Sequence, residues 1–317
     1  MSIENVFLRY LQSQQTVQSY LHHCYVQHNV ADAEMKSYEN CNAFLYYLDH
    51  GKRFYTQGGK SEPFMQPILY FYGMVHLIKA CLLTRRPEYP ESTNLLAHGV
   101  TARKKKKKNY RFLYDEVKIQ HNGLFPYFSE HLYQQRIPFE KRSMQGLLAL
   151  IPEMQALFQL DHHPHLVAVG RLSSPLFEFP ISLLDNYHLT ETAFIQRIRT
   201  YLPPIKYIDS DQQMIRMEVE HPITKPHGPF FMHQQSKQLF FPIHREDYLP
   251  IHEVMVHYLI LYNLSMLGRY ETEWWGDLFV NKPDTDFPYI MQFLQVTAYK
   301  IPYLLTAELY KQKRDFS

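Results

Sequence analysis

The chain has 317 residues, of which 45% are hydrophobic and 20% are charged, and its formal net charge is +2. This length supports one large domain or two small ones, and the composition is that of a soluble globular protein. The near-balance of charge excludes a chain that is basic enough overall to bind nucleic acid non-specifically.

The three cysteines have neither metal-binding nor redox spacing, and they are Cys24, Cys41 and Cys81. An odd number without such spacing is typical of a reducing compartment, so we expect a cytoplasmic protein. The N-terminus lacks the basic-then-apolar order of a signal peptide. The best membrane-span candidate, residues 64–83, contains residues that are costly in lipid: Gln66, Pro67, His76 and Lys79. We therefore expect a buried core helix there and no contact with a membrane.

The first hundred residues predict helices. Two are expected over 16–28 and 31–50, and Gly51 is expected to end the second, because glycine favours the position after a helix end. A third helix is expected to begin at Ser61 as its N-cap, with a proline in its first turn. It is apolar on nearly all sides, so it should lie at the centre of the fold. A short helix is expected to end near His98, where Gly99 turns the chain.

A basic run follows and consists of Arg103, Lys104, Lys105, Lys106, Lys107 and Lys108. Such a run is usually a solvated loop. It can also contact phosphates, with Tyr110 and Phe112 nearby for stacking. Both interpretations stay open, and the run is our candidate polyanion site.

Alternation of polar and apolar residues predicts strands in the middle of the chain. Residues 116–120 alternate, and His121-Asn122-Gly123 supplies a turn, so residues 124–128 are expected to return as the second strand of a hairpin. Helix is predicted over 144–160, with a break near Pro152.

The next segment, 161–238, is irregular and rich in proline. Alternation within it predicts strands over 166–169 and 214–219, and a second hairpin is expected from residues 230–233 and 238–241.

The C-terminal part returns to helix over 251–267, through the tryptophans, and over 287–311 with a break at Pro302. These elements together predict a mainly helical α+β fold with small antiparallel hairpins. We expect a single compact chain over residues 1–317, within which 1–160 and 161–317 would be the two lobes.

Several apparent metal or phosphate motifs fail on spacing. Gly58-Gly59-Lys60-Ser61 lacks the first glycine of a phosphate-binding loop, because Phe54 occupies that position. His252 and His257 are five apart, or about 140° around a helix, so they do not share a metal easily. The histidine-rich segment 161–165 and the pair formed by Cys24 and His28 could each hold a metal, but isolated clusters of this kind are usually surface loops. We expect no metal and no cofactor.

Three segments carry a family resemblance. The first is Lys36-Ser37-Tyr38-Glu39-Asn40-Cys41, the second is Leu95-Leu96-Ala97-His98-Gly99-Val100-Thr101, and the third runs from Asn263 to Trp275. Together they resemble the YaaC-like family of bacilli, across most of the chain and in one order. The resemblance implies no reaction. It implies a link to purine nucleotide metabolism, because members tend to be encoded beside IMP dehydrogenase.

These segments supply the candidates for a ligand or partner site. Arg269 is suited to a fork-shaped ion pair with Glu271, Glu273 or Glu39. Trp274 and Trp275 would point about 100° apart on a helix, so one can be core while the other meets a ligand. Each candidate also has a purely structural interpretation, and the set is Glu39, Asn40, His98, Arg269, Tyr270, Glu271, Trp274 and Trp275.

A looser likeness links the expected helical core to HEPN-type bundles, a group that includes ribonucleases. The active form of that group uses Arg, four to six residues, and then His. Arg245 and His252 have this spacing, although Pro250 lies between them and Glu246 departs from the usual polar residue. Packing and ion pairing are the structural alternative for both residues.

Two hypotheses of function follow. The first is a cytoplasmic, non-catalytic interaction protein that regulates a partner, with IMP dehydrogenase as the suggested partner. The second is an HEPN-like RNA-binding protein or ribonuclease that uses Arg245, His252 and the run from Lys104 to Lys108. The lack of a complete catalytic set and the many tyrosines favour the first, although tyrosines also serve in a core.

Overall fold

The computed structural model describes residues 3–102 and 110–314, and these contain twelve α-helices and nine strands. The predicted class, mainly helical α+β, is confirmed. The chain forms two compact units, one from Met1–Met144 with His257–Ser317 and one from Gln145–Val256. This division differs from the lobe boundary expected at residue 160. The expectation of a single compact chain stays a prediction.

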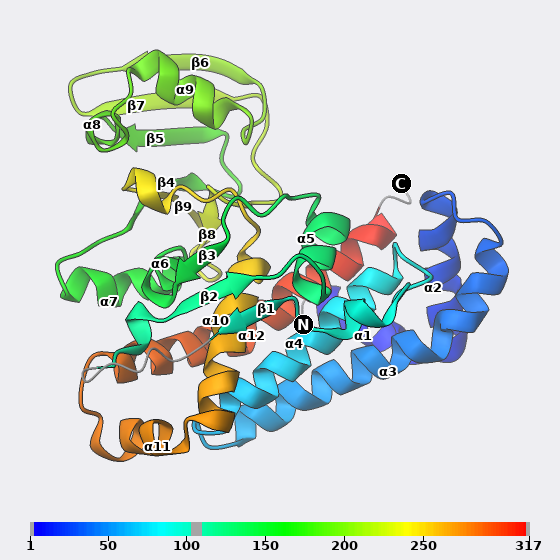
Figure 1. Cartoon of the computed structure of the whole chain (residues 1–317). Coiled ribbons are helices and arrows are strands. Elements are labelled where there is room, and N and C mark those ends of the chain that lie inside the picture. The colour runs from blue at the N-terminus through cyan, green and yellow to red at the C-terminus, as the bar shows by residue number, and fades with distance from the viewer. Residues whose placement is uncertain (1–2, 103–109, 315–317) are drawn as a thin grey trace. The chain divides into compact units, whose positions relative to one another are not determined.

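Helices dominate the first unit (Figure 1). In chain order they are α1 (Ile3–Tyr10), α2 (Gln14–Gln27), α3 (Ala33–Lys60), α4 (Gln66–Leu83), α5 (Leu124–Tyr133), α10 (Glu253–Tyr270), α11 (Thr272–Asn281) and α12 (Asp286–Arg314). Short 3-10 turns occur at η1 (Thr93–Leu96) and η2 (Phe112–Tyr114). The first four residues of α10 belong to the second unit and the rest to the first.

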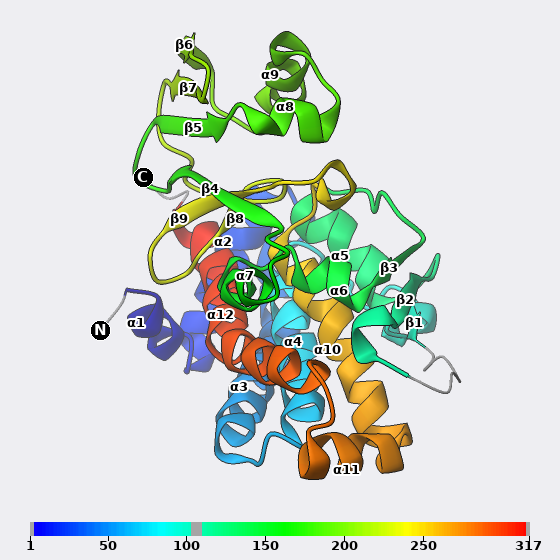
Figure 2. The ribbon, with the colours of Figure 1, turned by 90° about the vertical axis from the view of Figure 1, so that its left-hand side faces the viewer.

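The centre of this unit is α4, as its apolar composition predicts. Figures 1 and 2 show α4 surrounded by α3, α10 and α12. Phe71 of α4 is fully buried, and its ring lies 5.3 Å from Tyr258 and 5.6 Å from Tyr262 of α10. Among the described residues, α4 is the one helix apolar and long enough to cross a membrane, and 67% of it is buried inside the protein. Such burial is what a core helix requires.

Glycine brings α3 and α4 unusually close together. We expected Gly51 to end a helix, but α3 continues through it to Lys60. A Cβ atom at Gly51 would lie 2.6 Å from Cδ2 of Leu77 and 3.2 Å from the carbonyl oxygen of Gly73. Gly51 therefore serves as a contact point between two helices, and its helix-ending tendency is overridden by packing.

The other predicted ends of helices need correction as well. Ser61 is the C-cap of α3 and not the N-cap of α4, which begins at Gln66 with Pro67 in its first turn. The segment before His98 forms only a 3-10 turn that ends at Leu96. The final helix, α12, runs through Pro302 without the expected break.

A small three-stranded antiparallel sheet completes the first unit. Its strands are β1 (Val100–Ala102), β2 (Glu116–Ile119) and β3 (Lys141–Ser143), with β2 in the middle. The predicted strand at 116–120 is confirmed, but residues 124–128 do not return as its partner, because they begin α5. Leu124, Phe128 and Leu132 are all buried, and a spacing of four residues is typical of one face of a helix. A five-residue window is too short to reveal that period.

The second unit contains a six-stranded antiparallel sheet in the order β6-β7-β5-β4-β9-β8. The strands are β4 (Leu166–Arg171), β5 (Leu176–Pro180), β6 (Ile205–Ser210), β7 (Met214–Val219), β8 (Phe231–Met232) and β9 (Gln238–Pro242). Both predicted strands and the second predicted hairpin are confirmed, with Phe231 opposite Phe240 in the β8–β9 pair. The helices are α6 (Met144–Leu148), α7 (Gln155–Leu160), α8 (Ser182–Tyr187) and α9 (Glu191–Arg199).

An aromatic core holds α8 and α9 against this sheet. Phe194 of α9 lies 5.6 Å from Phe179 of β5 and 5.8 Å from Phe241 of β9, measured between ring centroids. The ring of Tyr187 in α8 contacts those of Phe194 and Phe241, and its hydroxyl donates to the carbonyl of Pro242 at 2.9 Å.

The helical segment 144–160 is interrupted by the turn η3 (Pro152–Met154), as predicted.

Candidate functional site

One face of the apolar helix α4 carries polar side chains. Tyr72, His76 and Lys79 are spaced by four and three residues, so they lie along one side of the helix. All three are half-buried. A helix that is otherwise core therefore presents a phenol, an imidazole and an ammonium group in one row.

The neighbouring helix α3 packs aromatic and basic side chains against this row. Phe54 stacks on His76 with ring centroids 5.6 Å apart and planes 16° apart. His50 meets His76 edge-on at 5.3 Å. The ammonium of Lys79 lies 5.6 Å from the ring centroid of Tyr47. Rings and basic groups thus alternate along the contact between α3 and α4.

His98 reaches the same face from the loop before β1. Its ring centroid lies 4.9 Å from that of Phe71, 6.3 Å from Tyr72 and 5.7 Å from Tyr262. Its carbonyl oxygen accepts from the Tyr258 hydroxyl at 3.0 Å. The backbone at His98 is therefore fixed to α10, and its imidazole is held among rings of α4 and α10.

Arg269, in the last turn of α10, completes the group. Its Nη1 donates to the hydroxyl of Tyr72 at 3.2 Å, and its Nε donates to the carbonyl of Ser265 at 3.0 Å. The guanidinium carbon lies 5.9 Å from the ring centroid of Tyr72 and 5.3 Å from that of Tyr270. Contact with Tyr72 thus brings together Arg269 and His98, two of the candidates from the sequence.

We call five residues the α4 basic cluster: His50, His76, Lys79, His98 and Arg269. Within the described parts of the chain, none of them forms an ion pair with a carboxylate. The expected ion pair of Arg269 with Glu271, Glu273 or Glu39 does not form there. The charges of Lys79 and Arg269 are therefore not neutralised by a described carboxylate.

Burial and mutual repulsion both act on these groups. Burial lowers the pKa of His76 from its usual 6.5 to about 4, with further lowering by the charges of Lys79 and His50. Burial also lowers the pKa of His98, followed by the charges of Arg269 and Lys79. The pKa of Lys79 is lowered by burial. Lys79 thus acts on both imidazoles, so its positive field links the two halves of the cluster.

A buried hydroxyl lies beside the cluster. Tyr89 is 5% exposed, and its hydroxyl has no hydrogen-bond partner in the described protein. Burial raises the pKa of Tyr89, and the neighbouring Tyr47 raises it further. The Nδ1 atom of His76 also has no partner there. Because buried polar atoms are seldom left without a hydrogen bond, these two are the first places to look for contact with a ligand.

Two other candidates lie elsewhere on α3. Glu39 pairs with Lys36 at 3.1 Å, within one turn of the same helix. Asn40 donates to the Tyr25 hydroxyl at 3.0 Å and to the carbonyl of Pro87 at 2.9 Å. Asn40 therefore ties α3 to α2 and to the segment after α4.

The tryptophans also separate in role. Trp275 is fully buried, and its Nε1 donates to the carbonyl of Phe64 at 3.1 Å. Trp274 is half-buried, with its ring 4.8 Å from that of Tyr110. Tyr270 is exposed and Glu271 is half-buried. The basic run, Arg103 to Lys108, lies outside the described residues.

Comparison with protein families tests the family resemblance described above. A family model described as YaaC-like Protein matches residues 9–309, which is nearly the full chain. The chain belongs to the YaaC-like family. Comparison with curated proteins and with solved structures gave no match. The likeness of this YaaC-like protein to HEPN bundles therefore stays a prediction.

The Arg245 and His252 pair of the YaaC-like protein flanks the start of α10. Arg245 is exposed in the turn η4 (Arg245–Asp247), and His252 is half-buried just before Glu253. The Nδ1 atom of His252 accepts from the backbone N–H of Val254 at 3.2 Å, so one ring nitrogen caps the helix. In the part of the chain that the structure describes, no group of three or more His, Cys, Asp or Glu is placed to hold a metal ion.

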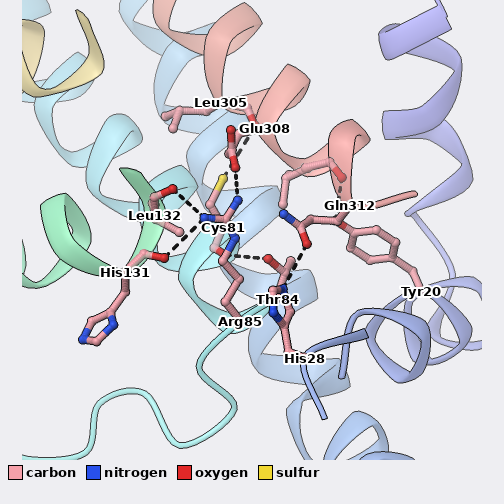
Figure 3. Close-up of polar contacts among 11 residues, drawn as sticks. Tyr20, His28, Cys81, Thr84, Arg85, His131, Leu132, Leu305, Glu308 and Gln312 are labelled. Atoms are coloured by element: carbon pink, nitrogen blue, oxygen red, sulfur yellow. Dashed lines mark hydrogen bonds and ion pairs between the residues drawn. The ribbon is translucent and has the colours of Figure 1, made fainter. Parts of the chain in front are cut away.

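A second polar cluster in the YaaC-like protein is satisfied internally (Figure 3). Arg85 and Glu308 form an ion pair with side chains that are 11% and 15% exposed. Nη1 of Arg85 also donates to the carbonyls of His131 and Leu132 in the last turn of α5. The side-chain oxygen of Gln312 accepts from the guanidinium of Arg85, and its side-chain nitrogen donates to Nε2 of His28. These contacts join α2, α4, α5 and α12, and they fit a structural role.

Sequence reasoning missed most of the α4 basic cluster. His98 and Arg269 were selected, His76 and Lys79 were treated only as residues too polar for a membrane span, and His50 was not among the candidate site residues. The signal that could have revealed them is their common face on an otherwise apolar helix.

Proposed function

We propose that this YaaC-like protein is a cytoplasmic, non-catalytic interaction protein that regulates a partner, and that the α4 basic cluster is where it recognises an anionic group. The observation that carries the proposal is the gathering of five basic side chains without a described carboxylate partner. Lys79 and Arg269 supply positive charge and the imidazoles supply hydrogen-bond donors, so the arrangement is suited to binding an anionic group.

The cost of this arrangement supports a functional role over a structural one. Basic groups on a solvated surface cost little, but His76, Lys79 and His98 are half-buried, and burial lowers the pKa of each. Desolvation and mutual repulsion both disfavour the cluster in the free protein. Perturbed titratable groups gathered at one place are typical of functional sites. The Arg85 cluster shows the contrast, because there the charge is neutralised by Glu308.

The partner that we propose is an enzyme of purine nucleotide metabolism, and IMP dehydrogenase is the first to test. This part of the proposal rests on the family to which the chain belongs and on the gene neighbourhood that membership implies. The exposed aromatic side chains Tyr38 and Tyr46 on α3 support an interaction role, because amphipathic rings are favoured at interfaces.

The test is a tagged pull-down from native cytosol, with and without nuclease. Wild type is compared with Lys79→Gln/Arg269→Gln and with the control Lys60→Gln/Arg199→Gln, which removes the same charge from two exposed positions. We expect a nuclease-resistant enzyme partner that is retained by the control and lost by the cluster variant. RNA-binding proteins that disappear with nuclease would instead support the RNA hypothesis. Loss of RNA cleavage in His252→Ala would then be the next result to seek.

A further inference from the structure

We infer that the α4 basic cluster binds a nucleoside phosphate, with the phosphate among Lys79, His98 and Arg269 and the base against neighbouring aromatic rings. This inference rests on the proposed function and specifies the chemical class of its anion. It follows from three features of the cluster: free donors, half-buried rings and a buried hydroxyl.

The donors for a phosphate come from three separate elements. Lys79 is on α4, His98 is in the loop before β1, and Arg269 is on α10. The ammonium of Lys79 lies over the Tyr47 ring and makes no hydrogen bond with a described residue. Arg269 donates to Tyr72, Ser265 and Met266, and a guanidinium has further N–H groups beyond these three contacts. Arg269 and His98 both contact Tyr72, and the pKa of His98 is lowered by burial and then by the charges of Arg269 and Lys79, so the three groups are neighbours. Basic groups from several elements are suited to a multiply charged group such as phosphate.

The rings distinguish a nucleotide from a simple inorganic anion. Tyr47, Phe54 and Tyr72 are half-buried and each contacts a basic group of the cluster, so each is neither core nor fully exposed. A nucleobase stacks on such rings whatever its sequence identity, because every base has a π-face. An inorganic phosphate would make no use of them. The alternation of rings and cations therefore favours a ligand that carries both an aromatic ring and negative charge.

The buried hydroxyl of Tyr89 has hydrogen-bonding capacity that a polar ligand would use. This residue is 95% covered by protein, since its exposed fraction is 5%, and its hydroxyl has no described partner. Its ring lies 5.4 Å from that of Tyr127, and Tyr47, which contacts Lys79, is close enough to act on its pKa. The sugar hydroxyls of a nucleoside would supply the missing hydrogen bond. Lys79 and Arg269 are half-buried, whereas binding of a nucleic-acid strand needs charges on an exposed surface. A mononucleotide is therefore favoured over a strand.

Calorimetric titration of the full chain with GMP, AMP and UMP tests the inference, with guanosine and inorganic phosphate as the separated parts. We expect at least one nucleotide to bind roughly tenfold or more tightly than either part. Lys79→Gln and Arg269→Gln should each weaken that binding by roughly ten- to a hundredfold, whereas Lys60→Gln and Arg199→Gln should not. Tyr72→Phe, which keeps the ring, should retain more affinity than Tyr72→Leu. Far-ultraviolet circular dichroism confirms that each variant is folded.

Three results would overturn the inference. One is no saturable nucleotide binding at about 1 mM ligand, the weak limit of useful recognition. Another is equal affinity for inorganic phosphate and for nucleotides, which would leave an anion site and the proposed function intact. The third is tight binding of a single-stranded RNA with no mononucleotide binding. If the nucleotide binds as expected but the cluster variant still retains its protein partner, the inference stands and the proposed route of partner recognition fails.

Discussion

The imidazole of His76 stacks on the ring of Phe54, with planes only 16° apart, while the charge of Lys79 opposes its protonation. Burial, and then the charge of Lys79, thus favour the same state of His76, which is the neutral ring. This relationship has a consequence for the dependence of stability on pH.

His76 should make the protein sensitive to acid. Its pKa falls from the usual 6.5 to about 4 on folding, mainly because of burial, so the unfolded chain binds the proton more readily. The stability that comes from keeping His76 neutral is present above about pH 6.5 and is lost as the pH falls towards about 4. The variant His76→Phe keeps the stacking and removes the titration, so its melting temperature should fall less steeply between about pH 8 and about pH 5.

Some acid sensitivity should remain in His76→Phe, because burial also lowers the pKa values of His98 and His131. Parallel curves of melting temperature against pH for the variant and wild type would show that His76 does not titrate in this way. Differential scanning fluorimetry in matched ionic strength gives the comparison.

Gly51→Ala should destabilise the protein by about 1–3 kcal/mol, although alanine is the better helix former. The added Cβ would lie 2.6 Å from Leu77 and 3.2 Å from the backbone oxygen of Gly73, so α3 and α4 would have to separate. The matched control is Gly59→Ala in the same helix, where nothing lies within 4 Å of the added atom. That variant should be neutral or gain up to about 1 kcal/mol. Urea denaturation measures both, and equal effects would contradict the role of Gly51 as a contact point.

Glu308→Gln should cost about 3 kcal/mol, because it leaves Arg85 charged and largely buried without its carboxylate. The adjacent pair, Arg86 with Glu91, has side chains that are 39% and 36% exposed, so Glu91→Gln should cost less than about 1 kcal/mol. The double variant Arg85→Met/Glu308→Leu should cost less than the sum of its single changes, since it removes both charges together. A double-mutant cycle by urea denaturation measures these values, and strict additivity would argue against a coupled pair.

Trp275→Phe should destabilise the protein by about 2 kcal/mol, because it removes the hydrogen bond to the carbonyl of Phe64 and leaves unfilled space around a fully buried side chain. Trp274→Phe should cost less, since Trp274 is only half-buried against Tyr110. With two tryptophans in the chain, each variant leaves one reporter. Emission from Trp274→Phe should be the more blue-shifted, because the remaining Trp275 is fully buried. The opposite order of emission maxima would contradict the burial of Trp275.

The sequence predicted those helices and strands in which the spacing of apolar residues is regular within the element itself. The strand at 214–219 is found at β7 with the same bounds, and helix α2 lies within a residue or two of its prediction. The errors at Gly51 and at residues 124–128 share a physical cause. In both places the decisive contacts come from elsewhere in the chain, from α4 at Gly51 and from the packing of a longer helix at α5. No short window of sequence contains that information.

The candidate site was predictable in part for the same reason. His98 and Arg269 stand in segments that resemble a family, and each could be chosen without knowledge of the fold. That they meet at Tyr72 depends on how α4 and α10 pack. His76 and Lys79 occupy an apolar helix, in which composition alone favours a core role and conceals the polar face.

The insertion of Gln145–Val256 into the first unit sets an order of events during synthesis. The ribosome releases α3 and α4 early, but Tyr258, which covers Phe71, arrives only after the whole second unit has emerged. The six-stranded sheet can therefore fold before α10 and α12, which help to bury α4, have been synthesised. A nascent chain of this protein must keep its most apolar helix from aggregating for as long as its second unit takes to be made.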